Sequence, residues 1–393
     1  MFAVILGIIA AIFLLIAVHP FATYPISLHL FAKRRDRRFA DFAGPRPSCA
    51  ICMSAYNEED VIVAKVEQLI ATAEKYGPAT VHIYVDGSSD RTAELLEPYK
   101  DRADIVVSQE RNGKTYGLNV LIERSQSDLL MFTDANVEGD EDTLTGLARP
   151  FQDPKIGCTT ARLVYTNPGE SATSFLGALY WRIEESIKQV ESDTLGVVGV
   201  DGASFLVRRK LYHAAPADLI DDLYVTLNVL TSGATVIRVP EVVVRERSAV
   251  KAKEEFRRKM RIACQAMNVH RALAPALRKQ SFLVRYGYVS HRLIKWLMPY
   301  CLLISALCLL AAIFVGFGWI AGCAVLAAGV LALFGGSKGV PGLSVLYSAV
   351  LSLTGVGMGV AQSLLGRQRY RTWEPAATIR NAQGAPMDAR GGN

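Results

Sequence analysis

Two long stretches of this chain lack charged side chains. Residues 1–31 contain no Asp, Glu, Lys or Arg, and residues 297–366 contain only Lys338. About 20 apolar residues are enough to cross the hydrocarbon core of a bilayer, so both stretches are long enough to do so. Within the 393 residues we therefore expect membrane segments at both ends and a globular region of ordinary polarity between them.

The N-terminal apolar stretch also lacks the features of a secretory signal, since no basic residues precede it and no Ala-x-Ala-like cleavage site follows. Its positive charges come after it, at Lys33-Arg34-Arg35-Asp36-Arg37-Arg38. Basic residues remain on the cytoplasmic side of membrane spans, so we expect residues 1–32 to be a retained anchor and residues 33–48 a cytoplasmic linker. The net charge of +6 then indicates contact with anionic membrane lipids, and no nucleic-acid partner is expected.

Cysteine patterns that would indicate a zinc or redox site are incomplete. Cys49-Ala50-Ile51-Cys52 has the CxxC spacing, but neither a second CxxC nor a pair of histidines follows. The seven cysteines are an odd number, which in a cytoplasmic domain favours buried, reduced thiols. We interpret the CxxC as part of a buried strand.

Between the apolar ends, strand-like and helical runs alternate, which is typical of an α/β fold with a largely parallel sheet. Strands are expected at residues 49–54, 81–85, 105–108, 129–133, 157–165 and 203–207. Helices are expected at residues 60–76, 171–190 and 250–273.

Residues 281–297 are predicted to form an amphipathic helix at the membrane surface, with an ordinary bundle helix as the alternative. Its apolar face would hold Phe282, Tyr286, Val289, Leu293 and Trp296, and its basic face Arg285, Arg292 and Lys295.

Residues 298–366 are predicted to contain two or three membrane spans, from apolar runs at about 297–317, 318–334 and 342–365. Three spans would place the C-terminus outside the cell. The arginines of the following tail, 367–393, favour the cytoplasm instead, and the sequence leaves this conflict open. The end of that tail is expected to be disordered.

Polar side chains follow the expected strand at 129–133. Asp134 and Asn136 supply two oxygen ligands at the carboxyl end of that strand, where open α/β sheets bind their ligands. Mg²⁺ and Mn²⁺ take such ligands and share them with substrate phosphates. An isolated Asp-x-Asn is nevertheless more often a turn or a helix cap.

Other polar segments share this ambiguity when each is taken alone. Residues 54–59 and 84–92 follow the first two expected strands, and residues 109–119 contain Gly113-Lys114 without the spacing of a phosphate-binding Walker A loop. Each can be a turn or a cap, and Asp221-Asp222 can be the acidic first turn of a helix.

Taken in order, these segments resemble the inverting glycosyltransferases of family two, in their membrane-bound polysaccharide-synthase branch. The resemblance covers residues 46–270 and rests on Tyr56-Asn57-Glu58-Glu59, Asp86-Gly87-Ser88-Ser89-Asp90, Gly113-Lys114 with Asn119, Thr133-Asp134-Ala135-Asn136, Val198-Gly199-Val200-Asp201-Gly202-Ala203 with Arg208-Arg209, Asp221-Asp222, and Arg257-Arg258-Lys259-Met260-Arg261. It implies an α/β domain with the GT-A nucleotide-diphospho-sugar transferase fold at residues 49–275, flanked by transmembrane helices.

The resemblance also implies a role for each matching residue. The implied donor-binding residues are Tyr56, Asn57, Glu58, Asp86, Lys114 and Asp134. Asp134 and Asn136 would hold Mg²⁺ or Mn²⁺, although many members have an Asp at the second position. Asp222 would be the general base with Asp221 beside it, and the implied acceptor-binding residues are Gly202, Ala203, Arg258 and Arg261.

The implied function is transfer of a sugar from a nucleotide donor, expected to be UDP-linked, to a lipid-linked or growing glycan acceptor in cell-surface polysaccharide synthesis. The chain would be a multi-pass protein of a bacterial-type inner membrane with its catalytic domain in the cytoplasm. The sugar, the linkage and formation of a homo-oligomer are left open.

Two alternatives to this function remain. A processive synthase would also translocate its polymer, but processive members carry Gln-x-x-Arg-Trp where this chain has Arg258-Lys259-Met260-Arg261-Ile262. A non-catalytic membrane scaffold would only bind the nucleotide-sugar. The presence of Asp86, Asp134 and Asp222 argues against the scaffold.

Overall fold

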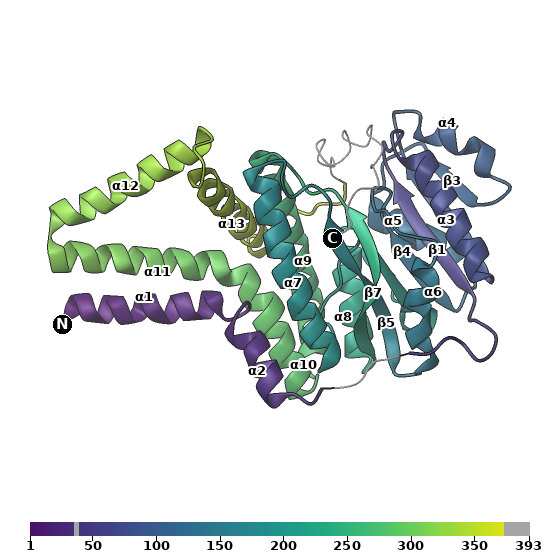
Figure 1. The fold of residues 1–393 in the computed structure, drawn as a ribbon, viewed down its shortest axis with the longest axis horizontal. Coiled ribbons are helices and arrows are strands. Elements are labelled where there is room, and N and C mark those ends of the chain that lie inside the picture. The colour runs from purple at the N-terminus through teal and green to yellow at the C-terminus, as the bar shows by residue number, and fades with distance from the viewer. Residues whose placement is uncertain (35–38, 373–393) are drawn as a thin grey trace, which may run out of the picture.

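An α/β domain and a group of long helices that projects from it make up the chain (Figure 1). The computed structural model describes residues 1–34 and 39–372. Most of the expected basic cluster, at 35–38, and the end of the expected tail, at 373–393, lie outside the described residues.

A seven-stranded sheet with the order β3-β2-β1-β4-β6-β5-β7 forms the centre of the domain. β1 pairs in parallel with β2 and β4, whereas β6 runs antiparallel to β4 and β5. The strands are β1 (Cys49–Ala55), β2 (Ala79–Asp86), β3 (Asp104–Ser108), β4 (Leu129–Thr133), β5 (Ile156–Tyr165), β6 (Ser204–Arg208) and β7 (Thr235–Glu246). All six expected strands are present with small shifts at their ends. β7 is a strand that the sequence analysis missed, because the exposed Pro240 interrupts its pattern, and it lies at the sheet edge where proline is tolerated.

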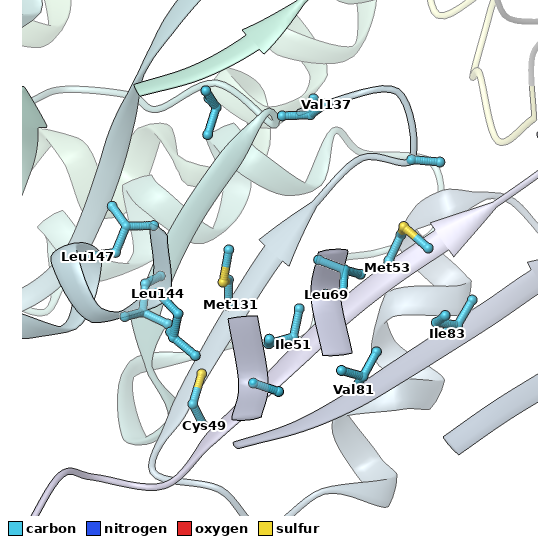
Figure 2. Packing of buried hydrophobic residues seen from close by; sticks show 14 of the residues in the cluster. Cys49, Ile51, Met53, Leu69, Val81, Ile83, Met131, Val137, Leu144 and Leu147 are labelled. Carbon is cyan, nitrogen blue, oxygen red and sulfur yellow. The ribbon is translucent and has the colours of Figure 1, made fainter. Parts of the chain in front are cut away.

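The two faces of β1 pack into different cores. Cys49, Ile51 and Met53 face the core beneath α3 (Ile62–Tyr76) and α6 (Thr143–Ala148), as Figure 2 shows for the strand side chains. Cys52 faces the opposite core, which α5 (Lys114–Arg124) and α8 (Asp221–Thr231) help to form. The two cysteines therefore point away from each other, and all seven cysteines are free, which confirms the interpretation of the CxxC as strand.

The remaining helices include two long ones that pack near the edge of the sheet. These are α7 (Ala172–Asp193), whose N-terminus has a capping box of Ser171 and Ser174, and α9 (Ala252–Arg278). The others are α1 (Phe2–Val18), α2 (Thr23–Phe31), α4 (Thr92–Leu96), α10 (Phe282–Gly287), α11 (Ile294–Phe317), α12 (Trp319–Ser337) and α13 (Leu343–Leu364), with the short 3₁₀ helices η1 (Glu97–Tyr99), η2 (Arg149–Gln152) and η3 (Arg209–Leu211) and the π-helical turn η4 (Tyr288–Leu293).

Three helical segments in the described part of the chain are long and apolar enough to cross a membrane. They are Phe282–Phe317, Trp319–Ser337 and Leu343–Leu364, and the pair α1 and α2, bent by 63°, would make a fourth if it is one span. Figure 1 shows α1 beside α11, projecting away from the sheet together with α12.

The segment at 281–297 differs from the expected surface helix. α10, η4 and α11 form one continuous helical segment. Arg292 and Lys295 contact the buried Glu184 of α7, whereas Phe282 is 71% exposed. Arg292 and Lys295 therefore face the domain, whereas Arg285 is exposed. The sequence periodicity alone could not show which of these side chains has a partner.

The C-terminal segment returns to the α/β domain. α11 leads away from the domain, while α12 and α13 lead back to it, and α13 packs along α9 (Figure 1). Beyond α13, Arg369 forms an ion pair with Asp218 at 3.0 Å and the carbonyl oxygen of Tyr370 accepts from Gln265 at 2.8 Å. The arginines after the last apolar run thus lie against the α/β domain.

Candidate functional site

A cleft of about 930 Å³ lies at the carboxyl ends of β1, β2 and β4. Its opposite side is formed by α7, α9, the start of α11 and the segment after α13. The cleft is lined by all but one of the expected site residues, namely Tyr56, Glu58, Asp86, Lys114, Asp134, Asn136, Gly202, Ala203, Asp221, Asp222, Arg258 and Arg261. Segments far apart in the chain are therefore brought to one place.

Asp86, the last residue of β2, fixes the turn that precedes α5. Its carboxylate accepts hydrogen bonds from the backbone N–H groups of Asn112, at 2.7 Å, and Gly113, at 3.0 Å. Gly113 has a φ of 95°, a conformation that glycine adopts without strain, and it opens the helix that begins with Lys114. Asp86 thus directs the start of α5, and therefore Lys114, toward the cleft.

The turn after β1 holds the other residues expected to bind a nucleoside. Asn57 is in the left-handed region with a φ of 51°, and its side-chain oxygen accepts from the backbone N–H of Ser89 at 2.8 Å. Asn57 therefore links the turns after β1 and β2. The guanidinium carbon of Arg111 lies 3.5 Å from the ring centre of Tyr56, so a base can stack on that face only if Arg111 moves.

Three charged groups converge beside Gly202. A Cβ atom placed on this glycine would lie 3.3 Å from Asp222 Oδ2, 3.3 Å from Lys114 Nζ and 3.8 Å from Asp134 Oδ2. Lys114 Nζ itself lies 2.5 Å from Asp134 Oδ1 and 3.8 Å from Asp221 Oδ2. A side chain at Gly202 would fill the space between Lys114 and Asp134 and the Asp222 carboxylate of α8.

Burial and neighbouring charge shift the ionisation of this centre. Burial, with the adjacent Asp221 carboxylate, raises the pKa of Asp222 to about 7, against the effect of Lys114. Burial alone would lower the pKa of Lys114, but Asp134 and Asp221 raise it above its ordinary value. Burial and the neighbouring Arg258 lower the pKa of Arg261 to about 10, which still leaves its guanidinium charged at neutral pH. The centre thus pairs a carboxylate that can exchange a proton near neutrality with permanent cations.

The side chains around Asp134 can supply only some of the ligands that a divalent cation needs. Among the described residues, no group of three or more His, Cys, Asp or Glu side chains could hold a metal ion. Asp134 and Asn136 offer two oxygen-bearing side chains, and Mg²⁺ commonly combines one or two protein carboxylates with substrate phosphates. The residues therefore fit an ion that a diphosphate also ligates.

A second group of charged residues lines the helical side of the cleft, and the sequence analysis did not identify it. Glu184 of α7 accepts from Lys295 at 2.7 Å, from His291 at 3.2 Å and from Arg292 at 3.2 Å. Burial would raise the pKa of Glu184, but these three partners hold it well below its usual range. A sequence signal did exist, since Glu184, Lys188 and Glu191 recur at helical spacing on one face of α7.

Glu246, at the end of β7, was not identified from the sequence, although it contacts the expected metal ligand Asn136. Its Oε1 accepts from Asn136 Nδ2 at 3.0 Å. Burial and the charge of Asp134 raise the pKa of Glu246 to about 7, while Arg258 opposes this shift. The missed strand therefore adds a carboxylate next to Asn136.

Comparison with known proteins agrees with this geometry. Residues 50–214 match the family model for Glycosyl transferase family 2. An N-acetylglucosaminyltransferase of Rhizobium sp. (strain N33) is 25% identical over 216 residues, which cover 50% of this chain and 48% of that protein. A poly-beta-1,6-N-acetyl-D-glucosamine synthase of Staphylococcus aureus (strain MSSA476) is 35% identical over 111 residues, covering 28% of this chain and 26% of that protein. This chain therefore spans about half the length of the first of these relatives, and less of the second.

The fold can be compared with solved structures as well. A mannosyltransferase from Pyrobaculum calidifontis, solved with GDP-Man and Mn²⁺, superposes with a TM-score of 0.69 and 19% identity over 92% of this chain and 100% of that one. At this identity the likeness shows a common fold. The expected α/β class and GT-A fold are thereby confirmed.

Proposed function

Because the chain carries a glycosyltransferase family 2 domain with the GT-A fold, we propose that it transfers a sugar, with inversion, from a UDP-linked donor to a lipid-linked or growing glycan. The observation that carries this proposal is the convergence of Lys114, Asp134 and Asp222 beside Gly202. The names of the relatives from Rhizobium and Staphylococcus support a role in polysaccharide synthesis with an N-acetylglucosamine donor.

Asp222 is the general base of this reaction. Inversion requires one group that removes the proton of the attacking acceptor hydroxyl, on the side of the sugar opposite the leaving diphosphate. A base works best when its pKa lies near the operating pH, and burial brings that of Asp222 to about 7. Asp221 contributes by raising this pKa, and the Gly202-Ala203 turn leaves room for the acceptor next to the carboxylate.

Lys114 and Arg261 stabilise the departing diphosphate. Both line the cleft and keep their charge at neutral pH, and fixed cations are worth most where negative charge develops in a site shielded from water. Asp134 and Asn136 would hold Mg²⁺ or Mn²⁺, which when bound supplies further neutralisation of the diphosphate. Tyr56, Glu58 and the turn that Asp86 fixes bind the nucleoside.

The membrane arrangement follows from the helices. α1, α11 and α12 cross a bacterial-type inner membrane, and the domain faces the cytoplasm, where nucleotide-sugars are made. The contacts of Arg369 and Arg371 with the domain support this orientation, because arginines that flank membrane spans favour the cytoplasmic side. Contact of the basic linker with anionic lipids adds to the attachment.

A processive synthase is the second candidate function. Ile262 takes the place of the tryptophan found in processive relatives, which favours limited transfer. However, Tyr165, Tyr180 and Trp181 line the cleft near α9, and aromatic rings of this kind can hold a sugar chain between additions. Sizing the product formed with excess donor separates the two, since processive synthesis makes long chains while most acceptor is still unmodified.

Incubation of the purified protein, in lipid nanodiscs with Mn²⁺, with a panel of nucleotide-sugars tests the proposed function. Mass spectrometry of the acceptor fraction is expected to show added sugar from one UDP-linked donor, and the Asp222→Asn variant should form little product under the same conditions. Binding of nucleotide-sugar without transfer from any donor of the panel would favour the non-catalytic scaffold instead.

A further inference from the structure

The end of β7 is joined to the turn that carries the expected metal ligands. The backbone N–H of Glu138 donates to the carbonyl of Arg245, and the N–H of Arg245 donates to the carbonyl of Glu138, both at 2.8 Å. This reciprocal pair fixes the position of the turn relative to the strand. It places Asn136 next to Glu246, and the Nδ2 of Asn136 donates to Glu246 Oε1 at 3.0 Å.

This hydrogen bond determines the orientation of the amide of Asn136. A carboxamide can present either its oxygen or its NH₂ group to a neighbour, and only the oxygen can bind a cation. An ionised carboxylate accepts hydrogen bonds but donates none. Glu246 therefore selects the rotamer with the NH₂ group toward itself, so the amide oxygen is directed away from β7 and is available as a ligand.

We propose that Glu246 is a positioning residue for a divalent cation, because it orients the amide of Asn136 as a ligand and supplies the negative charge that this amide lacks. The inference rests on the proposed function, which puts the cation at Asp134 and Asn136. Both side chains and Glu246 line the same cleft. Partners that orient metal ligands typically contribute about 10- to 100-fold to metal affinity.

A purely structural role for Glu246 makes a different prediction. Arg258 is the cation whose charge opposes the upward shift of the Glu246 pKa. It also interacts with Glu255 at 3.3 Å and with the hydroxyl of Tyr165 at 3.4 Å. If Glu246 served only to balance Arg258, then its neutralisation would change the stability of the domain and leave the affinity for metal unaltered.

The test measures Mn²⁺ affinity, by electron paramagnetic resonance of free Mn²⁺, for the full-length protein saturated with UDP at pH 8. Glu246→Gln is expected to weaken Mn²⁺ binding about 10- to 100-fold, because a glutamine can donate to Asn136 and let its amide reverse. UDP affinity in the absence of metal should stay unchanged. Glu241→Gln, an exposed change on the same strand, is the matched control and should bind Mn²⁺ like the wild type.

A double substitution gives the decisive comparison. Asn136→Asp alone brings two carboxylates to the position where Asn136 now donates a hydrogen bond to Glu246. Asn136→Asp combined with Glu246→Gln restores one donor and one anion there. The double variant should bind Mn²⁺ within about threefold of the wild type, and it remains informative if Glu246→Gln fails to fold. Wild-type Mn²⁺ affinity in Glu246→Gln, or loss of binding in a folded double variant, would overturn the inference.

The proposed function and the role of Glu246 can each fail without the other. A wild-type protein that transfers sugar but whose Mn²⁺ affinity does not respond to Glu246→Gln refutes the inference alone. A wild-type protein that shows the expected Mn²⁺ pattern but transfers no sugar refutes the proposed function and leaves the role of Glu246 supported.

Discussion

The two sides of the cleft are built in different ways. On the sheet side, Asp86 and Asp134 stand at or directly after the ends of strands, so a few neighbouring residues determine where they lie. On the helical side, Glu184 of α7 meets Lys295 of α11 across a long separation in the chain. The charged residues of the sheet side belong to short sequence motifs, whereas those of the helical side are paired only by the tertiary structure. Substitutions on the first side should therefore affect turnover, and those on the second should mainly affect stability or affinity.

The largest expected effect belongs to Asp134, on the sheet side. Asp134→Ala removes a carboxylate that pairs with Lys114 and that would ligate the cation, so we expect turnover to fall by at least about 10³-fold and UDP binding in Mn²⁺ to weaken. Product formation and UDP titration measure the two effects. Glu141→Ala, at an exposed residue of the following loop, serves as the control. An active Asp134→Ala protein, together with a wild type that works equally well in EDTA, would remove the basis for assigning metal chemistry to the sheet side.

On the helical side, Glu184→Gln should act on folding. The change leaves Lys295, His291 and Arg292 without their shared anion, and removal of one partner of a buried ion pair costs about 3–5 kcal/mol. Denaturant unfolding in detergent should show this loss, while Ser186→Ala, at an exposed site of α7, should not. Wild-type stability of Glu184→Gln with lost UDP binding would mean that the two sides do not divide their work as described.

A smaller effect on the rate is expected from pH, through the ionisation of Asp222 where the two sides of the cleft meet. Asp222 must be ionised to accept a proton, and its pKa is raised by burial to about 7, so the ionised fraction and the rate should rise by about tenfold from pH 6 to pH 8. The rate should not fall again up to about pH 9, because the pKa of Lys114 is shifted upward. Initial rates at saturating donor and Mn²⁺ measure this profile. A rate that decreases between pH 6 and pH 8 would contradict the role of an ionised carboxylate.

The same contrast explains how much the sequence could predict. Six strands and the sheet-side residues were predictable, because an apolar run marks each strand and its polar end follows directly in the chain. β7 was missed since Pro240 interrupts it, and with it the carboxylate of Glu246 next to Asn136. The basic face of the segment at 281–297 was expected at the membrane surface, but its partner Glu184 is a buried residue of α7 that periodicity cannot reveal. Asn57 was expected to bind the donor; its side chain connects two turns, a contact between distant segments that the sequence did not reveal.

The two sides of the cleft meet at Asp222, the proposed base of the reaction. Replacement of Asp222 by Asn keeps the shape of the side chain but removes its ability to accept a proton, so turnover should fall by about 10²- to 10⁴-fold. The affinity for UDP with Mn²⁺ should stay at the wild-type value, because the proposed role of Asp222 is toward the acceptor. Asp221→Asn is the matched neighbour and should have a smaller effect. Near-normal turnover in Asp222→Asn, or a severe loss only in Asp221→Asn, would contradict this assignment of the base.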